Sequence, residues 1–223
     1  MKVGLIYTST TPELIELVEQ EVKKQLGEDV EFYSLEDPSI LAEARDAGYV
    51  TTDAAARLIS MYMNAVRKGC TAMLNLCSSV GEVADSAQTV AAYIGVPIVR
   101  IDEEMCREAV RKGTKIGVMA TLSTTLEPTK NTIKRMSREC GKPVELIDCL
   151  VDGAFGLNQE AFQEKMKEYA GKIANDVDVI VFAQGSMAYC EQYIADTYDK
   201  IVLSSPRFGA EALKKALIKK GSF

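Results

Sequence analysis

Histidine is absent from this chain of 223 residues. Its absence removes the most common general base and the most common transition-metal ligand of proteins. Long apolar runs are also missing, because the segment near 177–183 is far shorter than the roughly 20 residues of a membrane-spanning helix. Neither G-x-G-x-x-G nor G-x-x-x-x-G-K-S/T occurs, so a nucleotide-binding function lacks its phosphate loop. Any chemistry performed here must use other groups.

Acidic residues outnumber basic ones, 32 against 26, which gives a net charge of −6 and a pI near 5.0. This balance argues against nucleic acid or an anionic membrane as a main partner. The sequence runs from Met1-Lys2 directly into a short apolar segment, unlike a secretory signal. Without such a signal, the six cysteines are expected to be reduced thiols. We therefore expect a cytoplasmic protein with a small-molecule partner, and a homo-oligomer remains open.

One structural pattern occurs twice along the chain. Residues 2–8, KVGLIYT, recur as residues 115–121, KIGVMAT, and both segments run into hydroxyl-rich sequence. Further along, residues 72–80, AMLNLCSSV, align with residues 179–187, VIVFAQGSM. An apolar strand that ends in polar backbone is typical of the loops that carry sites in parallel α/β folds. The repeat predicts two similar domains, which differ in having Cys in one and Gln in the other at the same position.

The pattern of apolar residues predicts a regular alternation of strands and helices. Strands are expected at 2–7, 29–35, 71–76, 97–101, 115–120, 143–148, 177–183 and 200–204. Helices are expected at 11–26, 39–47, 52–68, 82–94, 103–112, 127–140, 159–174, 187–197 and 207–219. Strands that alternate with helices form mainly parallel sheets, so the predicted fold class is α/β with two pseudo-symmetric Rossmann-like domains. The first would comprise residues 1–99 and 207–223, and the second residues 100–206.

Cys77 stands apart from the other cysteines. It directly follows a predicted strand and precedes Ser78, Ser79 and a helix, so backbone N–H groups and the helix dipole would favour its thiolate form. On this basis Cys77 would react with alkylating reagents faster than the other thiols near neutral pH. A buried packing role is the alternative. Four others are weaker candidates in helices or at a strand end, where cysteine usually packs: Cys70, Cys106, Cys140 and Cys149.

The motifs together resemble those of the aspartate/glutamate/hydantoin racemase superfamily, which includes arylmalonate decarboxylase and maleate isomerase. The resemblance covers nearly the whole chain and is carried by the segments 3–6, 76–79, 117–121 and 179–187. It implies two pseudo-symmetric α/β domains, an active-site cleft between them, and one cysteine at the matching strand end of each. It also implies an enzyme that uses neither an organic cofactor nor a metal ion.

The implied reaction is proton transfer at the carbon next to the carboxylate of a small acid or amino acid. Racemisation needs an acid on one face of that carbon and a base on the other, and two thiols can fill these roles. The resemblance gives Cys77 one role, while hydroxyls and backbone N–H groups would bind the carboxylate. The substrate-binding candidates are Thr8, Ser9, Thr10, Ser78, Ser79, Thr121, Ser123, Thr124, Gly185 and Ser186. Helix capping is the alternative role for each Ser and Thr among them.

Gln184 departs from the family pattern because it occupies the position of the second cysteine. An amide is neither an acid nor a base near neutral pH, although it donates and accepts hydrogen bonds. Cys190, six residues later, would replace it only through an unusual loop. One thiol therefore also fits a decarboxylase-like lyase, or an isomerase with Cys77 as nucleophile. A third alternative is a protein that binds a small carboxylate without turnover.

Two charged groups remain as candidates for binding. Arg207 follows the last predicted strand, where its guanidinium could pair with a substrate carboxylate, although a salt bridge to neighbouring helices explains it equally well. Residues 102–104, Asp-Glu-Glu, could attract a cation. Acidic residues in the first turn of a helix are expected from the helix dipole alone, so no metal site is predicted.

Overall fold

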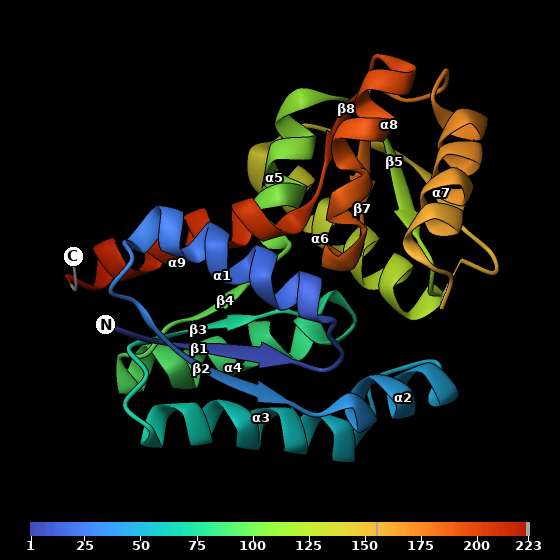
Figure 1. The fold of residues 1–223 in the computed structure, drawn as a ribbon. Helices are drawn as coiled ribbons and strands as arrows, with labels where there is room; N and C mark the ends of the chain where they lie inside the picture. Colours follow the sequence, from blue (N-terminus) through green and yellow to red (C-terminus); the bar gives the residue numbers. More distant parts are fainter. Residues whose placement is uncertain (155, 222–223) are drawn as a thin grey trace. The chain divides into compact units, whose positions relative to one another are not determined.

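A computed structural model describes residues 1–154 and 156–221, so positions 155, 222 and 223 of the predicted domains lie outside the described residues. The chain forms two compact units (Figure 1). The first unit is made of Met1–Ile101 and Pro206–Phe223, and the second of Asp102–Ser205. No helix in the described part of the chain is long and apolar enough to cross a membrane.

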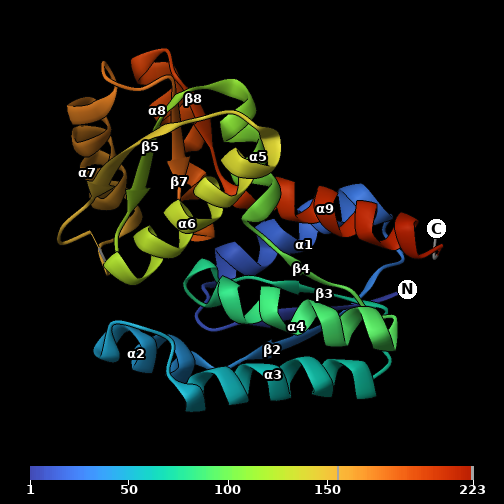
Figure 2. The ribbon, with the colours of Figure 1, turned by 180° about the vertical axis from the view of Figure 1, so that it is seen from behind.

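The first unit is built on a parallel sheet with the strand order β2-β1-β3-β4. Its strands are β1 (Lys2–Tyr7), β2 (Glu31–Glu36), β3 (Ala72–Asn75) and β4 (Ile98–Arg100). Its helices are α1 (Pro12–Leu26), α2 (Pro38–Ala47), α3 (Thr52–Arg67), α4 (Gly81–Ile94) and α9 (Ser205–Lys220), and a 3-10 turn, η1 (Ser78–Val80), precedes α4. Helices α1 and α9 lie on one face of the sheet, while α3 and α4 lie on the other (Figures 1 and 2).

Strand alternation explains the two hydrophobic layers of this unit. Successive side chains of a strand point to opposite faces of the sheet. Leu5 and Leu74 accordingly pack with residues of α1 and α9, whereas Ile6 and Met73 pack with residues of α2, α3 and α4. Thr11 caps α1 as predicted, since its hydroxyl accepts a hydrogen bond of 3.3 Å from the N–H of Leu14.

The second unit repeats this architecture with the strand order β6-β5-β7-β8, again all parallel. Its strands are β5 (Lys115–Ala120), β6 (Glu145–Leu150), β7 (Val179–Phe182) and β8 (Ile201–Leu203). Its helices are α5 (Glu103–Lys112), α6 (Ser123–Cys140), α7 (Gln159–Ile173) and α8 (Glu191–Tyr198), with a 3-10 turn, η2 (Gly185–Cys190), before α8. The predicted α/β fold with two similar parallel sheets is therefore confirmed.

Three local features differ from the predictions. Helix α6 begins at Ser123 instead of 127, so Pro128 lies inside it. Pro128 is the sixth residue of the helix and lies beyond its first turn, so it removes the internal hydrogen bond that an N–H at this position would make to the carbonyl of Thr124. The prediction of one helix at 187–197 missed that residues 185–190 form the 3-10 turn η2, and α8 begins only at Glu191. The turn η1 after β3 was missed as well.

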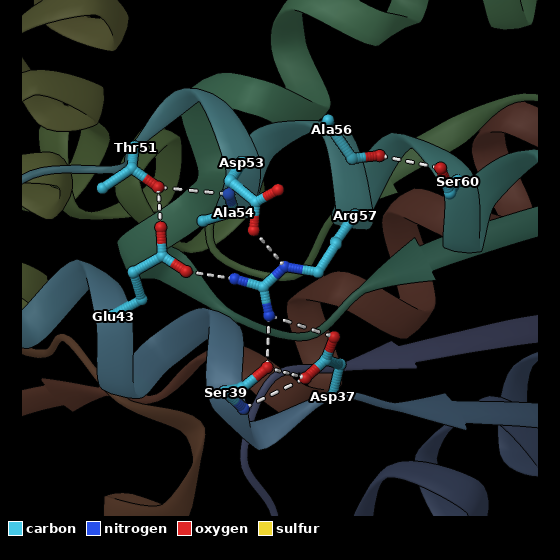
Figure 3. Close-up of polar contacts among 9 residues, drawn as sticks. All are labelled: Asp37, Ser39, Glu43, Thr51, Asp53, Ala54, Ala56, Arg57 and Ser60. Carbon is cyan, nitrogen blue, oxygen red and sulfur yellow. Dashed lines mark hydrogen bonds and ion pairs between the residues drawn. The ribbon is translucent and has the colours of Figure 1, made fainter.

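A polar network centred on Arg57 ties α2 to α3 (Figure 3). The Arg57 guanidinium forms ion pairs with Asp37, at 3.5 Å, and with Glu43, and its Nε lies 2.9 Å from Asp53 Oδ2. Asp37 also caps α2, and Thr51 caps α3. Because α2 packs against η1, this network supports one wall of the turn that follows β3.

Candidate functional site

The strand order places Cys77 at a location where parallel α/β sheets commonly bind ligands. Strand β1 pairs with β2 on one side and with β3 on the other, so the connections leave in opposite directions at this point. Ligands of open α/β sheets bind in the crevice at the carboxyl ends of such strands. Thr8 follows β1, and Cys77 follows β3 by two residues. The two side chains therefore meet at the topological switch point of the first unit.

Four hydrogen-bond donors surround the Cys77 thiol. They are the hydroxyls of Thr8 and Ser79 and the backbone N–H groups of Ser79 and Val80, and each lowers the pKa of the thiol. Burial of the sulfur has the larger effect, and it raises the pKa of Cys77 above the ordinary value for cysteine. The prediction that this environment favours the thiolate at neutral pH was therefore wrong. Sequence reasoning identified the donors but could not weigh them against desolvation.

These opposing effects define what Cys77 can do chemically. A thiol with a raised pKa holds its proton at neutral pH, as a proton donor must. Once the proton has left, the same four donors stabilise the sulfur anion that remains. The residue as a whole is partly exposed. The arrangement suits a group that gives up a proton and takes one back.

The other candidates in the first unit lie in two neighbouring loops. Thr8 is fully buried, and its hydroxyl faces the Cys77 thiol. Ser9 is exposed, and the Thr10 hydroxyl donates to the backbone carbonyl of Thr11 at 3.2 Å. Ser78 and Ser79 are buried in η1. Thr8 and Ser79 thus contact the thiol, whereas Ser9 is open to solvent and the Thr10 hydroxyl bonds to the neighbouring backbone.

In the second unit, the amide of Gln184 is bound to Thr121. Its Oε1 accepts a hydrogen bond of 2.8 Å from the Thr121 N–H, and its Nε2 donates to the Thr121 hydroxyl at 2.6 Å. Thr121 follows β5 and Gln184 follows β7, so this pair occupies the switch point of the second sheet. The pair matches Thr8 and Cys77 of the first unit. The side chain of Gln184 therefore occupies both the N–H and the hydroxyl of Thr121.

The remaining candidates of the second unit lie around this pair. Ser123 and Thr124 form the first turn of α6, and the Thr124 hydroxyl is inaccessible and without a partner in the described part of the chain. Gly185 and Ser186 begin η2, where Ser186 is exposed. The capping role considered for Ser123 is not observed, because Leu122 occupies the cap position of α6.

The charged candidates have structural partners. Arg207 is exposed near the start of α9, and its guanidinium lies 4.6 Å from the ring centre of Phe208. The acidic residues at 102–104 form the start of α5. Glu103 and Glu104 are ion-paired with Arg107, at 3.3 and 3.5 Å. Their arrangement is that of a helix start, as the alternative interpretation held.

Cys190 does not replace the missing thiol partner. It is fully buried in the core of the second unit with Phe182, Met187 and Ile194, and burial raises its pKa to about 11. Cys149 is buried in the same core, and burial raises its pKa to about 11 as well. Both cysteines therefore act as small packing residues.

We expect Cys140, instead of Cys77, to be alkylated first at neutral pH. Cys140 is the exposed cysteine, whereas the packing role predicted for it would have required burial. Cys77 should follow slowly, and its rate should keep rising above neutral pH, because the thiolate reacts and its pKa is raised. Peptide mapping after timed labelling checks this order, with denatured protein as the control. Faster labelling of Cys77 than of Cys140 would contradict the raised pKa.

Gly81, the first residue of α4, is packed against a buried arginine. A Cβ at this position would clash with the guanidinium of Arg100, whose side chain is 1% exposed and forms an ion pair of 2.7 Å with Asp85. Gly81 has ordinary helical backbone angles, so alanine would meet no backbone strain there. We expect Gly81→Ala to lower the free energy of unfolding by about 2 kcal/mol through overpacking. Urea unfolding checks this, with the exposed Thr89→Ala on the same helix as control; equal stability of both variants would contradict the close packing.

Sequence reasoning missed Asn75, which bonds directly to the Cys77 loop. Its Nδ2 donates to the Cys77 backbone carbonyl at 2.9 Å, and its Oδ1 accepts from the Tyr62 hydroxyl at 2.9 Å. The available signal was a polar residue inside an otherwise apolar strand, two positions before the cysteine.

Comparisons with known proteins agree with this geometry. A family model described as Asp/Glu/Hydantoin racemase matches residues 3–213. Allantoin racemase from Klebsiella pneumoniae superposes with a TM-score of 0.71 and 15% identity, covering 99% of this chain and 89% of that one. Glutamate racemase from Bacillus anthracis superposes with a TM-score of 0.71 and 17% identity, covering 99% of this chain and 82% of that one. Aspartate racemase from Picrophilus torridus superposes with a TM-score of 0.63 and 13% identity, covering 99% of this chain and 94% of that one. No curated protein sequence matches the chain.

Proposed function

Because the chain belongs to the Asp/Glu/hydantoin racemase family, we propose that it transfers a proton at the carbon next to the carboxylate of a small acid or amino acid. Cys77 is the acid/base, and the reaction needs neither an organic cofactor nor a metal ion. The observation that carries this proposal is the environment of the thiol, a sulfur at the switch point of the sheet surrounded by four hydrogen-bond donors.

The proposed reaction moves one proton between Cys77 and the substrate. Cys77 first loses its proton to solvent, and the four donors around the sulfur stabilise the thiolate. The thiolate then takes the proton from the carbon, the C–H bond breaks, and its electron pair moves into the carboxylate. Hydroxyls and N–H groups stabilise the added negative charge on the carboxylate oxygens. Return of the proton from the Cys77 thiol restores the C–H bond. The substrate-binding candidates include the Thr8 hydroxyl, which also faces the thiol, the Thr124 hydroxyl and, as a weaker one, Arg207.

A single-cysteine lyase is the second candidate, and Gln184 favours it. The family pattern has an acid/base at this position, but the amide of Gln184 is held by Thr121 and does not titrate. In a decarboxylation, the bond between carbon and a carboxylate breaks, CO2 leaves, and the electron pair stays on the carbon. The Cys77 thiol then supplies the one proton needed, which agrees with its raised pKa. A cis-trans isomerase with Cys77 as nucleophile needs only the same single thiol.

The test is a screen of small acids in heavy water followed by NMR. Pure enantiomers of amino acids and hydroxy acids, together with substituted malonates, are incubated with the enzyme. Loss of the signal of the α-hydrogen indicates proton transfer, and loss of a carboxylate indicates a lyase. A compound that binds, as shown by line broadening, but is never exchanged or cleaved would favour the third alternative, a non-catalytic binding protein.

A further inference from the structure

We propose that Tyr62 and Asn75 are positioning residues, which hold the Cys77 loop in its working geometry through one buried chain of hydrogen bonds. The Tyr62 hydroxyl donates to Asn75 Oδ1, and Asn75 Nδ2 donates to the Cys77 carbonyl, each at 2.9 Å. The chain thus links helix α3, strand β3 and the loop that carries the thiol. This inference rests on the proposed function, in which Cys77 transfers the proton.

Both residues lie in the hydrophobic interior, where polar groups are unfavourable unless they are hydrogen-bonded. Tyr62 is 0% exposed and Asn75 is 1% exposed. Their neighbours include the fully buried Met73 and Leu58. A buried amide stabilises a fold little compared with an apolar side chain of similar shape, even when it is satisfied. The presence of this chain in the core therefore calls for a role other than stability.

The second unit shows that the fold does not need the chain. In the internal repeat, Asn75 corresponds to Phe182, which is fully buried in the apolar core. Tyr62 corresponds to Tyr169, which precedes Phe182 by the same interval along the sequence. The polar pair thus occurs in the unit whose strand ends at a cysteine, and an apolar residue replaces the amide where the strand ends at Gln184.

The chain acts on the thiol through the backbone. A fixed Cys77 carbonyl sets the direction of the next peptide units, which aim the N–H groups of Ser79 and Val80 at the sulfur. If the carbonyl is released, these donors move away, and the pKa of Cys77 rises further. Two charged groups also face this region, Arg100 on β4 and Asp85 on α4, and they are paired with each other at 2.7 Å.

The first test compares Tyr62→Phe with Tyr169→Phe, its counterpart in the internal repeat. Tyr62→Phe removes only the hydroxyl that anchors Asn75. We expect the pH midpoint of Cys77 alkylation, followed by peptide mapping, to rise by about one unit. The kcat should fall by about tenfold or more with little change in KM, because misplacement of a reacting group slows the chemical step. Tyr169→Phe should leave both values unchanged. Unchanged values in Tyr62→Phe would overturn the inference.

A double variant, Tyr62→Phe with Asn75→Leu, separates positioning from stability. Replacing both side chains by apolar groups leaves neither of them buried without its partner, so the protein should fold with a loss of stability limited to that of the Cys77 carbonyl, which loses its Asn75 donor. We expect it to show the same raised alkylation midpoint; a wild-type midpoint in this variant would overturn the inference. Alkylation needs no substrate, so these outcomes decide the positioning role even if the wild-type enzyme turns over no small acid. That last result would count against the proposed function alone.

Discussion

Cys77→Ala is expected to abolish turnover while leaving the protein folded. The thiol is the proposed proton carrier, and loss of a positioned acid/base costs about a hundredfold to ten-thousandfold in kcat. Stability should change by less than about 1 kcal/mol, because the side chain is partly exposed at a strand end and its loss leaves no large cavity. The measurement pairs the heavy-water exchange rate with urea unfolding of the same preparation.

Cys190→Ala is the matched control for this prediction. It removes the same thiol group from a fully buried position in the apolar core of the second unit. Here stability should fall by about 1 kcal/mol while the exchange rate stays near that of the wild type. Cys77→Ala should therefore lose activity and keep its stability, whereas Cys190→Ala should lose stability and keep its activity. Full turnover by Cys77→Ala on the true substrate would show that another group carries the proton.

The fold could be predicted because its signals are local. Apolar strands such as residues 115–120 end at the predicted residues, and Thr11-Pro12 marks the start of α1. The start of α6 could not be predicted in this way. Its first turn contains Ser123, Thr124 and Thr125, which sequence rules assign to loops and caps, and Pro128 follows within the helix. Packing of α6 on α5 and on its own sheet overrides these weak preferences.

The place of Cys77 in the fold was predicted, but the electrostatics around its thiol were not. A cysteine between a strand and a helix start can be recognised in the sequence, and Cys77 lies there. Its protonation depends on how far the surrounding side chains exclude water, which is a property of the folded core. The hydrogen bonds of Gln184 could not be predicted either, because they join it to Thr121, which lies 63 positions away in the chain. Asn75 was missed because its partner Tyr62 lies on a separate helix.

The stereochemical course in heavy water is the second large expected effect. If Gln184 has replaced the second acid/base, only the Cys77 side can deliver a proton. An amino acid should then exchange its α-hydrogen with retention of configuration, and a substituted malonate should yield one enantiomer of product. Chiral chromatography with mass spectrometry measures both outcomes. Efficient conversion of a pure enantiomer into an equal mixture, with deuterium incorporated, would contradict the assignment of Gln184.

Replacing Gln184 by cysteine should add the missing group and raise the rate at which a pure enantiomer loses its optical activity. The substitution removes the amide that binds the Thr121 N–H and hydroxyl, at 2.8 and 2.6 Å. Both donors would then be free to face the new thiol, as the Thr8 hydroxyl and two N–H groups face Cys77. Gln184→Ser is the matched control, because it frees Thr121 in the same way and has a similar size but cannot act as an acid/base near neutral pH. Faster racemisation by Gln184→Cys than by Gln184→Ser would assign the gain to the thiol, and equal rates would show that position 184 does not set the stereochemistry.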